Sequence, residues 1–161
     1  MESLGSLSYL LAHTATILYR QTDQALQERL GIGMSQFKIL MLLIDQPKVQ
    51  QRYLAESLGQ TEASISRQIK LLCQRGMLVA ATNPANRRQR VASPTPKGVK
   101  VARAAQEVVD EYHDPTFSQI TDKQQRQLLE MLRAMHATVC QAGKPYACEY
   151  GAGIGEAWHT T

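Results

Sequence analysis

The spacing of apolar side chains predicts six helices along the chain. Between residues 4 and 30, leucine and alanine recur three, four or seven positions apart, which is the period of one helix face. The same period returns five more times, and a glycine, a proline or a polar turn follows each segment. The predicted helices span about residues 4–30, 34–44, 50–58, 61–75, 95–112 and 121–139. The expected inward stripe of the second helix is Phe37, Leu40, Met41 and Ile44.

Local signals fix several of these helix ends. Thr61, Thr95 and Thr121 are predicted N-caps, because a threonine hydroxyl accepts a hydrogen bond from a first-turn N–H. Gln124 follows Thr121 at the spacing of a capping box. We expect the fifth helix to break at Asp114-Pro115, since proline removes a backbone donor and clashes with the preceding turn.

Helical periodicity fails once, between the fourth and fifth helices. Residues 77–82 are β-prone, residues 83–86 (Asn-Pro-Ala-Asn) form a turn cluster, and residues 87–93 offer a second strand. Together they predict a β-hairpin with a basic, exposed tip. A hairpin with so few apolar residues is not stable alone and must pack on the helices. The expected fold is therefore mainly α with one small β-hairpin.

Composition excludes several classes of protein. No apolar run approaches the roughly 18 residues that a membrane helix needs. The first residues carry no basic segment of the kind that begins a secretory signal. The three cysteines, Cys73, Cys140 and Cys148, are too few and too scattered for a disulfide scaffold. We expect a cytoplasmic protein that does not enter a membrane.

The positive charge is concentrated in the middle of the chain. Residues 34–98 contain ten basic and three acidic side chains, a net charge of +7, whereas residues 1–33 sum to −1 and residues 99–161 to −2. No acidic residue occurs between Glu62 and Glu107. A basic module between mildly acidic flanks indicates a polyanionic partner for the middle of the chain. The alternative is chance clustering on a solvated face.

Ala55, Gly59 and Ile65 have the spacing of a helix-turn-helix: a small residue where the helices approach, a turn glycine, and an apolar anchor in the second helix. The second helix carries short hydroxyls and long cations, which read base edges and hold phosphates. An ordinary helical hairpin would more often carry Glu–Lys pairs there. The candidate DNA-binding residues, including those of the predicted hairpin, are Arg52, Thr61, Ser64, Ser66, Arg67, Lys70, Arg87, Arg88 and Arg90.

These motifs make residues 5–142 resemble the MarR-type winged helix-turn-helix transcription regulators. The similarity is carried by residues 64–76, by the hairpin segment 83–88 and by Thr95-Pro-Lys-Gly98. Two departures from the family pattern are present: Asn83 and Asn86 replace its wing aspartates, and Pro94 replaces the leucine before the threonine. Amides still favour the turn, but they cannot form the ion pairs that the family's acids make with arginine.

The resemblance implies an intertwined homodimer that represses transcription by occupying a pseudo-palindromic operator in double-stranded DNA. Residues 1–33 and 115–142 would be dimerisation helices, 34–114 the DNA-binding lobe with its connecting helix, and 143–161 an irregular tail. The apolar first and last helices agree with this arrangement, and a monomeric six-helix bundle is the alternative. The resemblance also implies that a small aromatic ligand releases the DNA, with His13, Phe37 and Met41 as candidate pocket residues.

No catalytic motif is found in the chain, so an enzyme is not expected. There is no Gly-x-Ser-x-Gly elbow and no Walker loop, and Gly151–Gly155 lacks the spacing of a nucleotide loop. Cys140 and Cys148 match no standard metal-ligand spacing, so neither a metal nor a cofactor is predicted. A competing functional interpretation is a small-molecule sensor whose DNA binding is vestigial.

Overall fold

The computed structural model describes residues 4–83 and 86–139, and of residues 82–83 and 86–90 the backbone alone. It has six helices and one two-stranded antiparallel hairpin within those residues, as the sequence predicts. The elements are α1 (Leu4–Leu30), α2 (Met34–Asp45), α3 (Gln51–Leu58), α4 (Glu62–Gln74), β1 (Leu78–Asn83), β2 (Asn86–Pro94), α5 (Pro96–Phe117) and α6 (Asp122–Val139).

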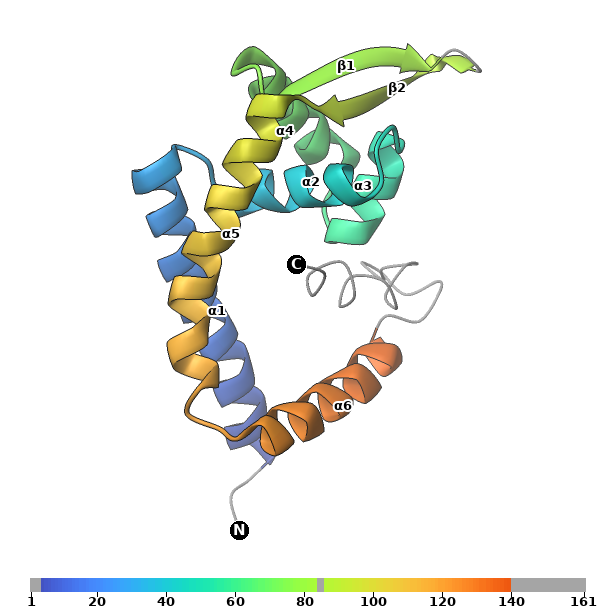
Figure 1. Cartoon of the computed structure of the whole chain (residues 1–161). Helices are drawn as coiled ribbons and strands as arrows, with labels where there is room; N and C mark the ends of the chain where they lie inside the picture. Colours follow the sequence, from blue (N-terminus) through green and yellow to red (C-terminus); the bar gives the residue numbers. More distant parts are fainter. Residues whose placement is uncertain (1–3, 84–85, 140–161) are drawn as a thin grey trace.

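Two long helices form a stem that carries a compact lobe at one end (Figure 1). α1 and α5 pack along each other in this stem. The lobe consists of α2, α3, α4 and the β1–β2 hairpin, and the first turns of α5 connect it to the stem. α6 leaves the far end of the stem and extends away from α1 and α5 (Figure 1). None of the helices in the described part of the chain is long and apolar enough to cross a membrane.

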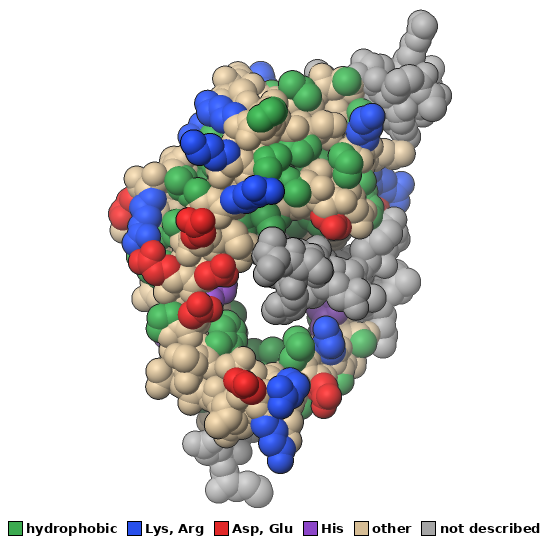
Figure 2. Space-filling model, in the orientation of Figure 1, with side chains coloured by type: hydrophobic (Ala, Val, Ile, Leu, Met, Phe, Trp, Pro, Cys, Tyr) green, Lys and Arg blue, Asp and Glu red, His purple; other side chains and the backbone are tan. Residues whose placement is uncertain are grey.

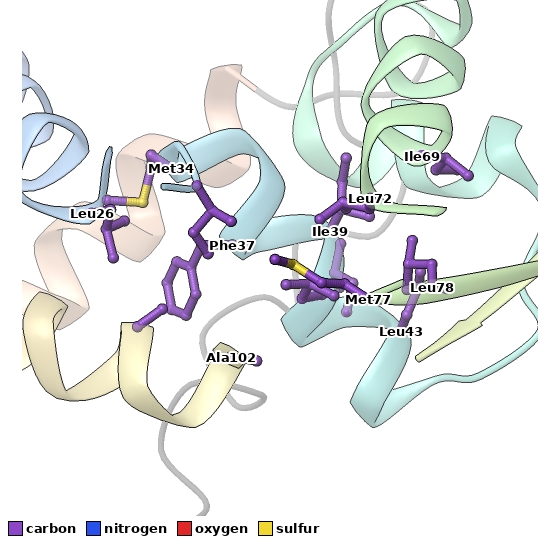
Figure 3. Close-up of a cluster of buried hydrophobic side chains, with 14 of the residues drawn as sticks. Leu26, Met34, Phe37, Ile39, Leu43, Ile69, Leu72, Met77, Leu78 and Ala102 are labelled. Carbon is purple, nitrogen blue, oxygen red and sulfur yellow. The ribbon is translucent and has the colours of Figure 1, made fainter. Parts of the chain in front are cut away.

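α2 lies at the centre of the hydrophobic core. Phe37 and Leu40 are fully buried, and so are Ile39 and Leu43 on the other side of the helix. Figure 3 shows Phe37 beside Leu26 and Met34, whereas Leu43 lies on the side of Met77 and Leu78. α2 is thus covered by the stem on one side and by the rest of the lobe on the other.

The predicted one-sided stripe of α2 was therefore wrong in part. Ile44 is 37% exposed, and Met41 is only partly buried against the core. The amphipathic pattern assumes one covered face. A helix with neighbours on two sides buries additional positions, here Ile39, Leu42 and Leu43.

The three predicted N-caps are confirmed. The Thr61 hydroxyl accepts a hydrogen bond from Ser64 N, and the Thr95 hydroxyl accepts one from Gly98 N. Thr121 and Gln124 form the reciprocal capping box: Thr121 N donates to Gln124 Oε1 at 2.9 Å, and Gln124 N donates to Thr121 Oγ1 at 3.4 Å. These ends were predictable because each depends on residues within one helical turn.

α5 does not break at Asp114-Pro115, which corrects the sequence-based prediction. The helix continues through Pro115 to Phe117. Proline at this position removes only its own N–H bond, and the position lies close to the end of the helix. The exposed side chains of Ser118 and Gln119 both donate to the Pro115 carbonyl, which partners a group left open at the helix end.

The register of the wing hairpin is irregular close to its turn. β1 and β2 pair regularly from Leu78↔Pro94 to Thr82↔Arg90, and the next pair is Asn83↔Asn86. Residues 87–89 of β2 have no paired residue in β1 between these two pairs. The backbone therefore places Arg87 and Arg88 within β2, as the predicted second strand 87–93 implies, in its irregular part close to the turn. An extra loop of backbone bends a strand and increases its twist.

Large apolar side chains remain uncovered on α1 and α6. The N-terminal half of α1 exposes leucine and tyrosine side chains, and no described side chain of α6 is buried. Hydrophobic side chains also gather where the stem meets α6 (Figure 2). The exposed apolar residues of these two helices are Leu7, Tyr9, Leu10, Leu11, Ile17, Tyr19, Leu129, Met131, Met135 and Val139.

The hairpin and α5 meet at the carbonyl of Met77. Thr95 N donates to this oxygen at 3.0 Å, and the Thr95 hydroxyl lies 3.2 Å from it. Gly98 passes so close that an added Cβ would lie 2.1 Å from the same oxygen. Glycine is therefore required at residue 98 because of the backbone opposite it and not because of its own backbone conformation.

We predict that Gly98→Ala lowers the free energy of unfolding by about 1–3 kcal/mol, as overpacking does in tightly packed interiors. At an open helical position alanine is instead more stable than glycine by about 0.5–1 kcal/mol. Urea denaturation measures the change. The control compares Lys100→Ala with Lys100→Gly, since Lys100 is exposed on the same helix. A stabilised Gly98→Ala protein would show that the close approach does not exist.

Candidate nucleic-acid interface

α3 and α4 form the helix-turn-helix around Gly59. Gly59 adopts the left-handed conformation at φ 60°, which a glycine tolerates without steric cost. The turn is closed by Gln60 N, which donates to the Ala55 carbonyl at 2.9 Å. Ala55 and Ile65 are both buried where the two helices pack. The three residues that predicted the motif therefore have the expected roles.

α4 presents one exposed polar face away from the core. Ile65, Ile69 and Leu72 are buried on the inner side. Arg67 and Lys70 are exposed and, at 100° per residue, fall on the opposite side, and the exposed Ser66 lies at the edge of that face. Ala63 and Gln74 are exposed on the same face, although the sequence analysis did not select them. The helical period alone could have identified both, and an alanine methyl group can contact the methyl group of thymine.

Two of the predicted DNA-binding hydroxyls have partners within the protein. The Thr61 hydroxyl caps α4, and the Ser64 hydroxyl lies 3.2 Å from Gln60 Oε1. Gln60 Nε2 in turn donates to Ser35 Oγ, at the start of α2, at 2.9 Å. Ser64 lies on the flank of α4, so it helps to attach the recognition helix to the turn and to α2.

A second side-chain contact joins the same helices. Gln36 Nε2 donates to Gln68 Oε1 at 3.0 Å, between α2 and α4. Sequence reasoning missed Ser35, Gln36, Gln60 and Gln68 as supports. Glutamine and serine carry no positional signal unless they cap a helix or turn, and these partners are 25 to 32 residues apart.

The remaining predicted cations lie at the periphery of this surface. Arg52 is exposed on α3, and its Nε lies 2.7 Å from Glu56 Oε1. An exposed ion pair of this kind contributes little to stability. Arg52 could therefore leave Glu56 and bind a DNA phosphate at little cost in free energy. Arg87, Arg88 and Arg90 belong to β2, which follows α4 and β1 in the chain, and their side chains lie outside the described part of the structure.

Charge is segregated between the lobe and the stem. Figure 2 shows lysine and arginine side chains over the lobe and a group of acidic side chains along the α5 stem. These acids follow the acid-free segment of the sequence, beginning at Glu107. A surface with one sign of charge raises the local concentration of an oppositely charged partner. The lobe is therefore the part of the molecule suited to a polyanion.

The three candidate ligand residues are not gathered at one point. His13 is exposed and stacks on Tyr9, with ring centroids 5.3 Å apart. Phe37 is fully buried in the core, and Met41 packs at the edge of the core. Their role in binding stays a prediction.

A cation lies between α1 and α2 that the sequence analysis did not select. Lys38 Nζ is 5.4 Å from the ring centroid of Tyr19. Burial lowers the pKa of Lys38, while burial and then the charge of Asp23 raise the pKa of Tyr19. A partly desolvated ammonium above an aromatic ring attracts anions and ring systems more strongly than a solvated one.

Polar contacts also hold the stem together. The Thr22 hydroxyl is buried and donates to Leu18 O at 2.8 Å, and His113 Nε2 lies 3.3 Å from it. Because a hydroxyl has one proton, the geometry assigns the proton of this contact to Nε2. Burial lowers the pKa of His113, against the opposing charges of Asp110 and Asp114.

The described residues contain no cluster of three or more His, Cys, Asp or Glu side chains able to hold a metal ion. Cys73 is partly buried against the core on α4. Cys140, Cys148 and the predicted tail 143–161 lie outside the described residues.

Comparison with known proteins finds a family match within the lobe and relatives over most of the chain. The model of the MarR family matches residues 30–89. The chain is 23% identical over 124 residues to the transcriptional regulator HosA of Escherichia coli O111:H-, covering 76% of this chain and 92% of that protein.

Two solved structures share the fold over most of the chain. The MarR family transcriptional regulator Sco3205 of Streptomyces coelicolor, solved in complex with DNA, superposes with a TM-score of 0.75 at 23% identity, over 89% of this chain and 91% of that one. CouR of Rhodococcus jostii RHA1, bound to p-coumaroyl-CoA, superposes with a TM-score of 0.73 at 23% identity, over 84% and 95%. The helix-turn-helix segment therefore matches the MarR family, and the stem and lobe share the winged helix-turn-helix fold of these solved structures.

Proposed function

We propose that this protein is a sequence-specific, double-stranded DNA-binding transcription regulator of the cytoplasm, acting as a repressor and not as an enzyme. The observation that carries the proposal is the exposed face of α4, with Ser66, Arg67 and Lys70 presented from a lobe whose sequence has no acid after Glu62. The relative Sco3205 was solved in complex with DNA, which supports the same use of this fold.

The geometry suggests that α4 and the wing contact different parts of the DNA. The N-terminal turns of a recognition helix enter the major groove, where each base pair presents a distinct set of donors and acceptors. Arg67 has the length and the planar fork to hold a guanine edge. β2 would bring Arg87 and Arg88 to the minor groove or the backbone, where the sequence information is degenerate.

A homodimer would complete the operator-binding unit. Exposed leucines and tyrosines on α1, and methionines on α6, form apolar surface that a single chain leaves in water. A twofold dimer would cover this surface and present two copies of α4 to the half-sites of a pseudo-palindrome. Occupying a promoter in this way would block transcription without any further activity of the protein.

We also propose that a small aromatic ligand releases the DNA. Lys38 and Tyr19 lie between α1 and α2, where the stem joins the lobe, and Met41 lies on the same helix as Lys38. A carboxylate on the ligand would find a partly desolvated cation there. The relative CouR binds p-coumaroyl-CoA, an aromatic acyl compound, which supports this class of ligand.

Selection of duplexes from a random-sequence library tests the function directly. The full-length protein should enrich an inverted repeat. Enrichment of no sequence would instead favour the alternative, a small-molecule sensor with vestigial DNA binding.

On the selected duplex, we predict that Arg67→Ala weakens binding by about 1–3 kcal/mol and relaxes the base preference at one position of each half-site. Fluorescence anisotropy on the selected and random duplexes measures both effects. Arg103→Ala is the control, because Arg103 is also exposed but lies on the stem. Equal losses for the two variants would show that α4 does not read the bases.

Binding should weaken steeply with salt, because the lobe's cations displace condensed counterions from the phosphates. A dimer with several phosphate contacts should lose on the order of 10³-fold in affinity between about 50 and 200 mM salt. Titrations over this range give the slope. A flat response would mean that the charge of the lobe is not a DNA-binding surface.

We predict that the protein is a dimer in solution and that Met135→Glu shifts it toward the monomer, because a charge would be buried in the subunit interface. Light scattering gives the mass. Val79→Glu serves as the control: Val79 is 58% exposed and Met135 46% exposed, but Val79 lies on the wing. A wild-type protein with the mass of one chain would refute the assembly.

A further inference from the structure

Arg75 connects the recognition helix to the stem. It is the C-cap residue of α4, and its guanidinium reaches the C-terminal end of α1. There Nη1 donates to the carbonyl of Gly31, and Nη2 donates to the carbonyl of Leu30 at 3.3 Å. These partners are 44 and 45 residues away in the sequence. The contact therefore belongs to the tertiary structure and not to a local cap.

The end of α1 is suited to hold this side chain. The last carbonyls of a helix have no partner within it, and they carry the negative end of the helix dipole, which favours a cation. Gly31 adopts φ +66°, so it turns the chain out of α1 without strain. An added Cβ on Gly31 would lie 3.0 Å from Arg75 Nη2, so the glycine also leaves room for the guanidinium.

The backbone of Arg75 joins a third helix to the same point. Lys97, in the first turn of α5, donates from Nζ to the Arg75 carbonyl at 2.7 Å. The end of α1, the end of α4 and the start of α5 therefore meet around one residue. Lys97 touches α4 but has no part in the bonds to α1, which makes it a matched control for the guanidinium.

The stem also holds the lobe at the start of α2. Asp23 on α1 accepts a hydrogen bond from Met34 N at 2.6 Å, in place of the missing side-chain cap on Gly33. Asp23 thus fixes α2, the central helix of the core. Arg75 acts on α4 itself, which carries the candidate base-reading face.

We propose that Arg75 is a positioning residue for DNA binding, which fixes the direction of the recognition helix relative to the stem and thereby the separation of the two recognition helices in the dimer. The inference rests on the proposed function, because it assigns a role within operator binding. In this role Arg75 acts through the position of α4 and does not itself contact DNA.

A dimer gains affinity from its second half-site only when the separation of its two recognition helices matches the spacing of the half-sites. Loss of the guanidinium frees α4 to change its angle to α1. The protein should then bind the correctly spaced duplex less tightly and reject an incorrectly spaced one less strongly. A change in spacing preference is a readout that loss of stability alone would not produce.

The experiment uses the full-length protein and three duplexes: one selected by the wild type from a random-sequence library, the same duplex with its half-sites moved apart by a couple of base pairs, and a random duplex. The variants are Arg75→Met, which keeps the aliphatic stem and removes the guanidinium, Arg75→Lys, which keeps one cation, and the control Lys97→Ala. Affinities are measured over a range of salt concentrations, and thermal unfolding is followed for each protein.

Arg75→Met should lower the affinity for the selected duplex about tenfold or more, as loss of hydrogen bonds to a charged group implies. Its discrimination against the altered spacing should fall, while the salt slope stays that of the wild type. Arg75→Lys should lie between Arg75→Met and the wild type, and Lys97→Ala should match the wild type.

Unchanged affinity and spacing discrimination in Arg75→Met would overturn the inference and leave the proposed function intact. A salt slope reduced by about one per subunit would also overturn it, because Arg75 would then be holding a phosphate. If Arg75→Met does not fold, Arg75→Lys decides, and wild-type spacing discrimination in that variant refutes the role. A wild-type protein that selects no sequence would refute the proposed function itself.

Discussion

Burial of α2 on two sides is the constraint on which the rest of the structure depends. Phe37 and Leu40 are fully buried, and Leu43 is fully buried toward the hairpin. Each such side chain contributes about 1.5–3 kcal/mol when it is removed from water. Because the stem and the lobe share this one helix, they form a continuous core, and the position of α4 is defined relative to α1.

Polar contacts at chain ends then set the angles that packing leaves open. The Met77 carbonyl joins the hairpin to α5, Asp23 holds the start of α2, and Arg75 holds the end of α4. These bonds are directional, and their partners are backbone groups with fixed positions. The exposed Arg29–Glu111 ion pair on the stem is of a different kind, because solvent screens it and it contributes little to stability.

The functional surfaces are what this core leaves uncovered. Covering α2 uses the inner faces of α1, α4 and α5, so the outer face of α4 stays polar and exposed. The N-terminal half of α1 and all of α6 lie beyond the core and keep apolar side chains in water. One molecule thus has a cationic lobe at one end and an apolar surface at the other. The first feature suits a polyanion such as DNA, and the second suits a second copy of the chain.

The sequence by itself determined the elements, their order and most of their ends. The caps at Thr61, Thr95 and Thr121 and the turn at Gly59 depend on neighbours within a few residues, so local chemistry suffices. The helical period also places Arg67 and Lys70 on the face opposite Ile65 and Ile69, where both are exposed. The continuation of α5 through Pro115 was not predicted, because the stop signal of a proline weakens close to a helix end.

Only the tertiary structure decided which side chains support the site. Ile44 is exposed and Ile39 buried because α2 has neighbours on two sides, which no one-sided pattern can encode. Ser64 is bonded to Gln60, and Arg75 reaches α1, through contacts that form only after the chain has folded back on itself. A sequence specifies the period and the chemistry of a helix face, whereas the partner of a polar side chain depends on which segment the core brings beside it.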